Sequence, residues 1–316
     1  MGSEGRRSAG DQGVTTERGD DGRNTHHLGE LVLVATPIGN LSDLSPRAAQ
    51  VLSSADCVCC EDTRHTGRLF ELCSLRARRL LSVHGHNEAS RIEEVLGMLE
   101  KGGTVALVSD AGTPCISDPG ERLVVAALSA GVTVSAVPGP FAGLIGLVAS
   151  GFPTERWRFE GFLPRKGTQR KARLTEVATA RHPTIIYEAP ARLSQTLEEL
   201  CAFCGPERRV SIGRELTKIH EEFFRGSLKE ADAWARDGEP RGEHVIVVDG
   251  APAPPEPDDD AIAEAMHALL AAGLARRDAV TACEALLGVP HRVAYAAALA
   301  NERVVRDTSI GDRSDA

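Results

Sequence analysis

Short aliphatic runs alternate with amphipathic stretches from Leu31 onward. The pattern predicts strands at 31–36, 56–61, 79–83, 104–110 and 132–137, and helices at 45–55, from about 62 to 72, 88–102, 121–131 and 140–151. Ser45 followed by Pro46 is a typical N-cap and first helical residue. Continuous apolar strands separated by helices favour a mostly parallel sheet covered on both faces. In such sheets, ligands bind beyond the carboxyl ends of the strands.

A second α/β segment follows, with strands predicted at 156–161, 183–189, 208–215 and 244–250. Four prolines and three aspartates in 251–260 predict an extended linker. Beyond it we expect three short helices, of which the middle pair resembles a helix-turn-helix; a helical cap on the main body is an equal alternative. The expected division is a disordered tail at 1–30, α/β domains at 31–150 and 151–250, the linker, a helical module at 261–306 and a tail at 307–316.

Composition narrows the class of protein. The 316 residues are 42% hydrophobic, 26% charged and only 4% aromatic, so a globular protein with an aliphatic core is expected. No apolar run reaches the roughly 20 residues that span a bilayer. The N-terminal tail carries no secretory signal either, so we expect a cytoplasmic protein. Because the net charge is −9, contact with nucleic acid would need a local basic patch.

Eight cysteines do not fall into a disulfide or zinc pattern. Cys57, Cys59 and Cys60 share one apolar run, and Cys201 and Cys204 form a lone C-x-x-C with no second pair. We therefore expect free thiols and no metal.

The loop Ser109–Gly120, SDAGTPCISDPG, is the strongest local signal. Two glycines permit unusual dihedrals or a close backbone approach, and two prolines fix the chain between them. A plain connection would need only about 2–6 residues and no such density of special residues, so a ligand-wrapping loop is favoured. Asp118 is expected to cap the next helix, with Pro119 at its first position.

Polar residues also gather where the other strands end, at 36–40, 61–66, 84–88 and 138–140, which predicts one shared cleft. The chain has no phosphate-binding P-loop, no dinucleotide G-x-G-x-x-G and no G-x-S-x-G elbow. In principle a hard cation could bind the carboxylates of this rim, Glu61, Asp62, Asp110 and Asp118.

A basic segment stands out against the acidic chain. The segment 165–173 contains five basic residues and no acidic one: Arg165, Lys166, Arg170, Lys171 and Arg173. Phosphate binding is the favoured interpretation, and a solvated helix face is the alternative. Arg192, Arg214 and Lys218 would extend this surface.

These strings together resemble one family. TPIGNL, CEDTRHT, HNE, LVSDAGTPCISDPG, PGP, EGFLPRKG, YEAPARL and RELTK occur in the order seen in the ribosomal RNA small subunit methyltransferase I family, over about 31–250. The resemblance implies a tetrapyrrole-methylase-like fold with a mixed second sheet, and a homodimer that binds S-adenosylmethionine. It further implies methylation of the ribose 2′-hydroxyl of a cytidine in the decoding centre of 16S rRNA, in the small ribosomal subunit.

The same resemblance implies the site residues. The methyl donor would lie against Ala111, Gly112, Thr113 and Ile116, with Pro37 beneath, Phe141 and Ala142 beside it, and Glu188 and Thr217 on its adenosine side. The chain departs from the family at Ala191 and Gly85, which concerns the substrate side.

A general base would help a ribose hydroxyl attack. We favour the group Glu61, Asp62 and Arg64, with His86, Glu88 and Glu215 as other candidates. RNA contacts are expected from Arg165, Lys166, Arg170, Lys171 and Arg192, and from Arg64. The alternatives are a tetrapyrrole or corrinoid methyltransferase, a non-catalytic ribosome-assembly factor and a metal-dependent phosphohydrolase.

Overall fold

The computed structural model describes residues 28–85, 87–238, 241–252 and 257–311, and the chain divides into two compact units between Ala251 and Pro252. Most of the tail expected at 1–30, part of the expected linker and His86 lie outside the described residues. No helix in the described ranges is both long and apolar enough to cross a membrane.

The first unit begins with a five-stranded sheet in the order β3-β2-β4-β1-β5, in which every neighbouring pair is parallel. This confirms the parallel sheet predicted from the continuous apolar strands. The strands are β1 (Glu30–Val34), β2 (Cys57–Cys60), β3 (Leu80–Ser82), β4 (Thr104–Leu107) and β5 (Thr133–Val137). The helices are α1 (Pro46–Ser54), α2 (Thr63–Leu72), α3 (Glu88–Glu100) and α4 (Glu121–Ser129), with a 3₁₀ turn at Leu41–Asp43.

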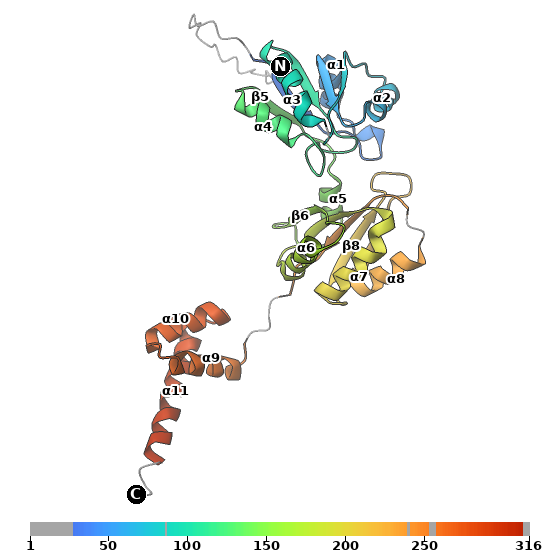
Figure 1. The fold of residues 1–316 in the computed structure, drawn as a ribbon. Helices are drawn as coiled ribbons and strands as arrows, with labels where there is room; N and C mark the ends of the chain where they lie inside the picture. The colour runs from blue at the N-terminus through green and yellow to red at the C-terminus, as the bar shows by residue number, and fades with distance from the viewer. Residues whose placement is uncertain (1–27, 86, 239–240, 253–256, 312–316) are drawn as a thin grey trace, which may run out of the picture. The chain divides into compact units, whose positions relative to one another are not determined.

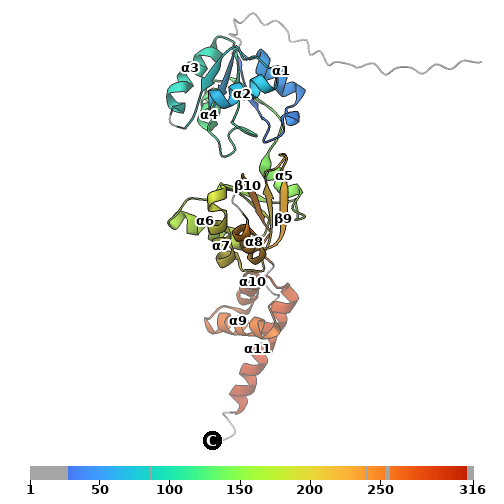
Figure 2. The same ribbon diagram turned by 90° about the vertical axis from the view of Figure 1, so that its right-hand side faces the viewer.

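Helices cover both faces of this sheet (Figures 1 and 2). Leu52 of α1 and Phe70 of α2 belong to the core on one face, and Leu99 of α3 and Leu123 of α4 belong to the core on the other. The start of α1 is as predicted, because the Ser45 hydroxyl accepts the N–H of Ala48 at 3.1 Å. Helices therefore cover both faces of the sheet, although Thr133 and Ala136 of the edge strand β5 remain exposed.

Strand β2 shows why the cysteines need no other role. Cys57 and Cys59 point into one core and Cys60 into the opposite one, as alternation along a strand requires. All eight cysteines are free thiols in the structure.

The second sheet is mixed, in the order β6-β7-β10-β8-β9, with β6 parallel to β7 and the other pairs antiparallel. Its strands are β6 (Arg158–Phe162), β7 (Thr184–Glu188), β8 (Arg209–Arg214), β9 (Glu222–Ser227) and β10 (His244–Val248). Strand β9 was not predicted, because adjacent Phe223 and Phe224 followed by Arg225 and Gly226 break the alternation expected of a strand. It is an edge strand held by its pairing with β8.

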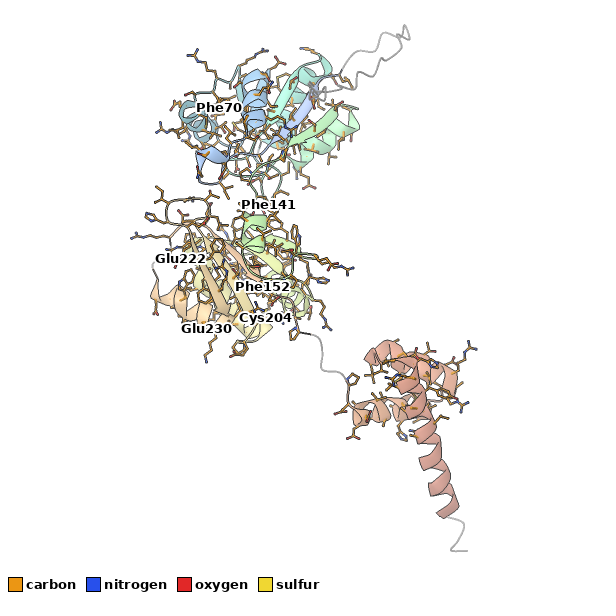
Figure 3. The ribbon with its side chains drawn as sticks, turned by 180° about the vertical axis from the view of Figure 1, so that it is seen from behind. Phe70, Phe141, Phe152, Cys204, Glu222 and Glu230 are labelled. Atoms are coloured by element: carbon orange, nitrogen blue, oxygen red, sulfur yellow. The ribbon has the colours of Figure 1, made fainter. Side chains whose placement is uncertain are left out.

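Three helices, α6 (Thr168–Thr179), α7 (Leu193–Cys204) and α8 (Leu228–Asp237), pack on one face of the second sheet. A 3₁₀ turn at Pro190–Arg192 leads into α7. The helix α5 (Ala142–Val148) was expected to close the first domain. Instead its buried Leu147 packs with Ile185 and Val247 on the other face of the second sheet. Figure 3 labels Phe141, which precedes α5, and Phe152, which follows it and joins the same core. Helix α5 thus belongs by packing to the second sheet.

The second unit contains the three predicted helices, α9 (Asp259–Ala271), α10 (Arg276–Leu287) and α11 (His291–Gly311). They share a small core that includes Met266, Val280 and Ala298. Gly288 ends α10 in a left-handed conformation, with φ of 66°. The tail expected from residue 307 is wrong at its start, because α11 continues to Gly311.

Candidate functional site

The first unit contains a cavity of about 210 Å³ between the loop after β4 and the ends of strands in the second sheet. Its lining includes Ile38, the stretch 110–113, the stretch 116–118, Phe141, Ala142, Phe162, Tyr187, Glu188, 215–216, Lys218 and 243–245. Every predicted donor-side residue except Pro37 and Thr217 contributes to it. The cavity therefore lies where the strand-end argument expects a ligand.

The loop Ser109–Gly120 is tied to two other strand-end loops. Thr36 and Gly112 form an isolated antiparallel bridge, and the Thr113 hydroxyl donates to the carbonyl of Pro140 at 2.9 Å. The Ser109 hydroxyl donates to the carbonyl of Gly112 at 3.2 Å. Three of the predicted loops thus converge on one rim and hold each other in place.

This loop also stores backbone strain. Cys115 and Ser117 are in the left-handed region with φ of 68° and 64°, which non-glycine residues rarely adopt. Such residues cost about 1–3 kcal/mol each and gather at ligand-binding sites. The conformation is therefore imposed by the surrounding contacts, as expected of a loop shaped for a ligand.

The helix cap predicted for Asp118 is wrong. Helix α4 starts after Gly120, and the N–H of Leu123 donates instead to the buried carboxylate of Glu88 at 3.2 Å. Asp118 lies too early in the chain to reach the first turn. Glu88 was a candidate base, but its carboxylate is 35 residues away in sequence from the helix it caps and is not on the cavity wall.

Asp118 lies on the cavity wall instead. Burial, together with the nearby charges of Glu61, Asp110 and Glu243, raises the pKa of Asp118 to about 6, although a hydrogen bond from Ser109 opposes the change. Asp110, also on the wall, accepts the N–H of Asp62 at 3.3 Å. Asp118 is thus a carboxyl group that can change protonation near neutral pH.

The predicted catalytic group Glu61, Asp62 and Arg64 does not line the cavity. Asp62 caps α2 through the N–H of Arg64 at 2.8 Å and pairs with the Arg64 guanidinium at 2.7 Å. Hydrogen bonds from Arg64 hold the pKa of Asp62 well below its usual range, which makes it a weak proton acceptor. Burial raises the pKa of Glu61. The local sequence explains the pairing. Asp62 is the N-cap residue of α2, and Arg64, two residues later, is close enough for its guanidinium to neutralise the capping carboxylate.

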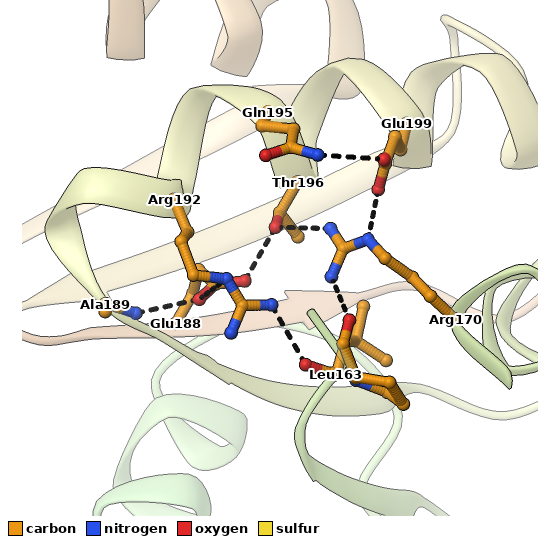
Figure 4. A network of polar contacts seen from close by, with 9 residues as sticks. Leu163, Arg170, Glu188, Ala189, Arg192, Gln195, Thr196 and Glu199 are labelled. Carbon is orange, nitrogen blue, oxygen red and sulfur yellow. Dashed lines mark hydrogen bonds and ion pairs between the residues drawn. The ribbon is translucent and has the colours of Figure 1, made fainter. Parts of the chain in front are cut away.

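A polar network holds the second-sheet side of the site (Figure 4). The carboxylate of Glu188 is fully buried; it accepts the hydroxyl of Thr196 at 2.6 Å and the N–H of Ala189 at 3.0 Å. Arg192 pairs with the same carboxylate at 3.3 Å and donates to the carbonyl of Leu163 at 2.9 Å. Glu188 was expected to approach the donor; its two oxygens are already engaged by the protein.

Arg170 belongs to this network and not to the RNA-binding surface predicted for it. It is 3% exposed, and its guanidinium pairs with Glu199 at 2.5 Å and donates to Thr196 at 2.8 Å and to the carbonyl of Pro164 at 2.9 Å. Each nitrogen that it could offer a phosphate is thus engaged inside the protein. Helix α6 buries this side because Arg170 shares it with Leu174 and Val177.

The other basic residues of the segment 165–173 do not belong to this buried network. Arg165, Lys166 and Lys171 are exposed and form no ion pair with any described residue, whereas Arg173 pairs with Glu160 and Glu176. The positive surface is therefore smaller than the sequence suggests.

Thr217 lies in a neighbouring hollow with Gly39 and Asn40. A Cβ on Gly39 would fall 2.4 Å from Lys218 and 2.8 Å from Thr217, so the loop after β1 packs tightly on the loop after β8. Pro37 is buried in the loop after β1 and does not line the cavity. Its neighbour Ile38 lies on the cavity wall instead.

The sequence analysis gave no role to several cavity residues, among them Tyr187 and His244. The hydroxyl of Tyr187 accepts the N–H of Gly143 at 3.0 Å, at the first turn of α5. His244 lies at the start of β10 and is 3% exposed. A polar residue at the head of the otherwise apolar run HVIVV was the available signal.

The lining suits a ligand with positive charge and an apolar ring. Lys218 is the one lysine of the lining. The lining also contains five acidic residues: Asp110, Asp118, Glu188, Glu215 and Glu243. Two buried polar atoms of this region, Nδ1 of His244 and the hydroxyl oxygen of Thr217, have no hydrogen-bond partner among the described residues. Buried polar atoms are normally paired, so these two retain unused hydrogen-bonding capacity.

Residues 30–232 match the family of tetrapyrrole (corrin/porphyrin) methylases. The chain is 42% identical over 270 residues to the ribosomal RNA small subunit methyltransferase I of Synechocystis sp., covering 85% of this chain and 96% of that protein. It is 43% identical over 277 residues to that of Mycobacterium tuberculosis, covering 87% and 96%.

Among solved structures, the methyltransferase CobJ superimposes with a TM-score of 0.55 at 21% identity, over 71% of this chain and 95% of that one, which shows a shared fold. On the strength of these relatives, the chain belongs to the ribosomal RNA small subunit methyltransferase I family.

Proposed function

We propose that this protein transfers a methyl group from S-adenosylmethionine to the ribose 2′-hydroxyl of a cytidine in the rRNA of the small ribosomal subunit. The observation that carries the proposal is the cavity in which the strained 110–118 loop faces the second sheet. Family membership supports it, because the relatives are named for modifying small-subunit rRNA.

The cavity fits the donor in two respects. S-Adenosylmethionine carries a sulfonium and an ammonium against one carboxylate, and the acidic lining favours that net positive charge. Its adenosine needs apolar contacts with a few hydrogen bonds, which Leu216, Val245 and the unpartnered His244 can provide. Ala111, Gly112 and Thr113 would hold the donor, which supplies an activated methyl group.

The chain itself has to align the acceptor and take up a proton. In an in-line displacement, the ribose oxygen bonds to the methyl carbon while the carbon–sulfur bond breaks and leaves its electron pair on sulfur. The hydroxyl proton goes to the carboxylate of Asp118, which takes over the role predicted for Glu61, Asp62 and Arg64. Alignment can contribute up to about 7–11 kcal/mol and a base typically ~10²–10⁴-fold.

The exposed Arg165, Lys166 and Lys171 would contact RNA phosphates. A tetrapyrrole or corrinoid acceptor, the nearest alternative, is small and would not need a basic segment of this kind. A non-catalytic assembly factor would not need the strained donor loop.

A homodimer in the cytoplasm is part of the same proposal. Helices α4 and α5 expose aliphatic side chains that a partner would cover: Val125 and Leu128, both 57% exposed, Leu144, 42% exposed, and Val148, 63% exposed. Sedimentation of the wild type against Val148→Glu would test this, with dissociation expected for the variant.

The experiment is transfer of labelled methyl from S-adenosylmethionine to small subunits that lack the modification. The expected result is label in rRNA at one ribose, seen as a phosphodiester that resists alkali. Label on a base, or label only on added tetrapyrrole, would overturn the proposal. Heat-denatured enzyme provides the blank.

A further inference from the structure

His244 occupies the middle of a polar row across the second sheet. It pairs in register with Glu188 on β7 and with Arg214 on β8. Residues directly opposite each other on neighbouring strands point to the same face, so the three side chains form one row at the end of the sheet that meets the cavity.

Both neighbours in this row pair with residues other than His244. Glu188 is held by Thr196, Ala189 and Arg192. Nη2 of Arg214 pairs with Glu222 of β9 at 2.7 Å, while its buried Nε has no hydrogen-bond partner among the described residues. His244 is 3% exposed and is one of the residues that line the cavity, and its Nδ1 has no hydrogen-bond partner among the described residues.

The imidazole is uncharged. Burial, together with the charge of the neighbouring Arg214, lowers the pKa of His244 to about 4, although Glu215 opposes the change. A neutral imidazole offers one N–H donor and one acceptor nitrogen. That suits an uncharged heterocycle and not a phosphate or carboxylate.

The carboxylates on the two sides of the cavity differ in their partners. On the second-sheet side Glu188 pairs with Arg192, and Glu215 and Glu243 pair with Lys218, whereas Asp110 and Asp118 on the first-sheet side form no ion pair with any described residue. Leu216 lines the cavity on the second-sheet side together with His244. A molecule with a cationic end and a flat heterocyclic end would therefore place its heterocycle against His244.

We propose that His244 hydrogen-bonds the adenine edge of the methyl donor and selects for a 6-aminopurine. This rests on the proposed function, since it assigns the orientation of that donor in the same cavity. His244 is then a specificity-determining residue in addition to the donor-side residues that the family resemblance implies.

The test is calorimetry with two ligands, S-adenosylhomocysteine and its 6-oxo analogue S-inosylhomocysteine. Wild type should prefer the adenosine compound. His244→Phe keeps a flat ring but removes both nitrogens, and should weaken binding of the adenosine compound roughly tenfold while reducing the preference between the two ligands. His244→Asn, which keeps a donor and an acceptor, should recover part of both.

Ser211→Ala is the matched control. The Ser211 hydroxyl is also buried and without a partner among the described residues, but it does not line the cavity, so its loss should leave both affinities unchanged. Unchanged affinity and preference in a folded His244→Phe protein would overturn the inference while leaving the proposed donor intact. Failure of wild type to bind either ligand would overturn the proposed donor itself.

Discussion

Thr36 and Gly112 exchange two backbone hydrogen bonds, from Thr36 N to Gly112 O at 2.9 Å and from Gly112 N to Thr36 O at 3.1 Å. They are 76 positions apart in sequence, and their bridge fixes the loop after β1 against the loop after β4. The Thr36 hydroxyl adds a third tie between the two loops by donating to the carbonyl of Ser109 at 3.3 Å. The shape of the cavity wall thus depends on one residue with φ of 86°, a value that favours glycine.

Gly112→Val should abolish donor binding, with at least a tenfold loss of affinity, and destabilise the fold by roughly 1–3 kcal/mol. A Cβ at this position would be strained by φ and would lie 3.2 Å from Ile38 and 3.5 Å from the carbonyl of Pro140. Calorimetry with S-adenosylmethionine and urea unfolding measure the two effects. Gly97→Ala, on α3 with open space around its Cβ, is the control and should leave binding unchanged.

Asp118→Asn should lower the methyl-transfer rate by roughly 10²–10⁴-fold. Donor affinity should fall by less, because four other acidic residues of the lining remain. In wild type the rate should rise with pH through about 6, as Asp118 loses its proton, and the variant should lack this rise. Rate profiles between pH 5 and 8 test the assignment. A variant that retains the wild-type profile would exclude Asp118 as the proton acceptor.

The same substitution has a distinct effect on stability. Because the pKa of Asp118 is raised from 3.8 to about 6, the folded state binds more protons than the unfolded state in that window. Wild type therefore loses stability as pH rises from about 4 to 6, while Asp118→Asn should not. The variant should gain about 1–3 kcal/mol relative to wild type between pH 4 and 7, measured by urea unfolding at both values.

Glu88→Ala should destabilise the protein by about 1–2 kcal/mol without a direct effect on the chemistry. The carboxylate of Glu88 is the side-chain acceptor at the start of α4, because Gly120 has no side chain to offer. Glu93→Ala, at an exposed position of the same helix α3, is the control. Equal midpoints of urea unfolding for the two variants would contradict this cap.

The N-terminal caps of α1 and α4 show what the sequence could and could not predict. Ser45 reaches its partner Ala48 within one turn, so the local pattern sufficed. The cap of α4 comes from Glu88, 35 positions earlier, and only the packing of α3 beside α4 brings the two together. Local signals likewise predicted nearly every strand, but not edge strand β9, which is held by its pairing with β8.

In the candidate site, too, features set by the local sequence were predicted and features set by tertiary packing were not. Residues of the 110–118 loop line the cavity because their motif is contiguous, whereas Thr217 falls in the hollow beside it. Asp62 and Arg64 were chosen for their chemistry, but each satisfies the other at the start of α2. For Arg170 a signal was present, since it lies four and seven residues before the buried Leu174 and Val177 on one helix face.

Arg170 and its basic neighbours should therefore separate in experiment. The double variant Arg165→Glu with Lys166→Glu should weaken RNA binding and reduce the salt dependence by roughly 0.7–0.9 in the logarithmic slope for each phosphate that the protein no longer neutralises. Donor affinity and stability should stay as in wild type, because both side chains are exposed and unpaired among the described residues. Filter binding across a salt titration measures the slope.

Arg170→Gln should instead lower stability and donor affinity and leave the salt dependence of RNA binding unchanged. It leaves Glu199 without its cation and removes the donor to Thr196, so unfolding free energy should fall by roughly 2–3 kcal/mol. Because Thr196 holds the Glu188 carboxylate on the cavity wall, donor affinity should fall as well. The salt slope of RNA binding should not change, since the Arg170 guanidinium is buried in the folded protein. A slope reduced as much as in the double variant would return Arg170 to the RNA-binding surface.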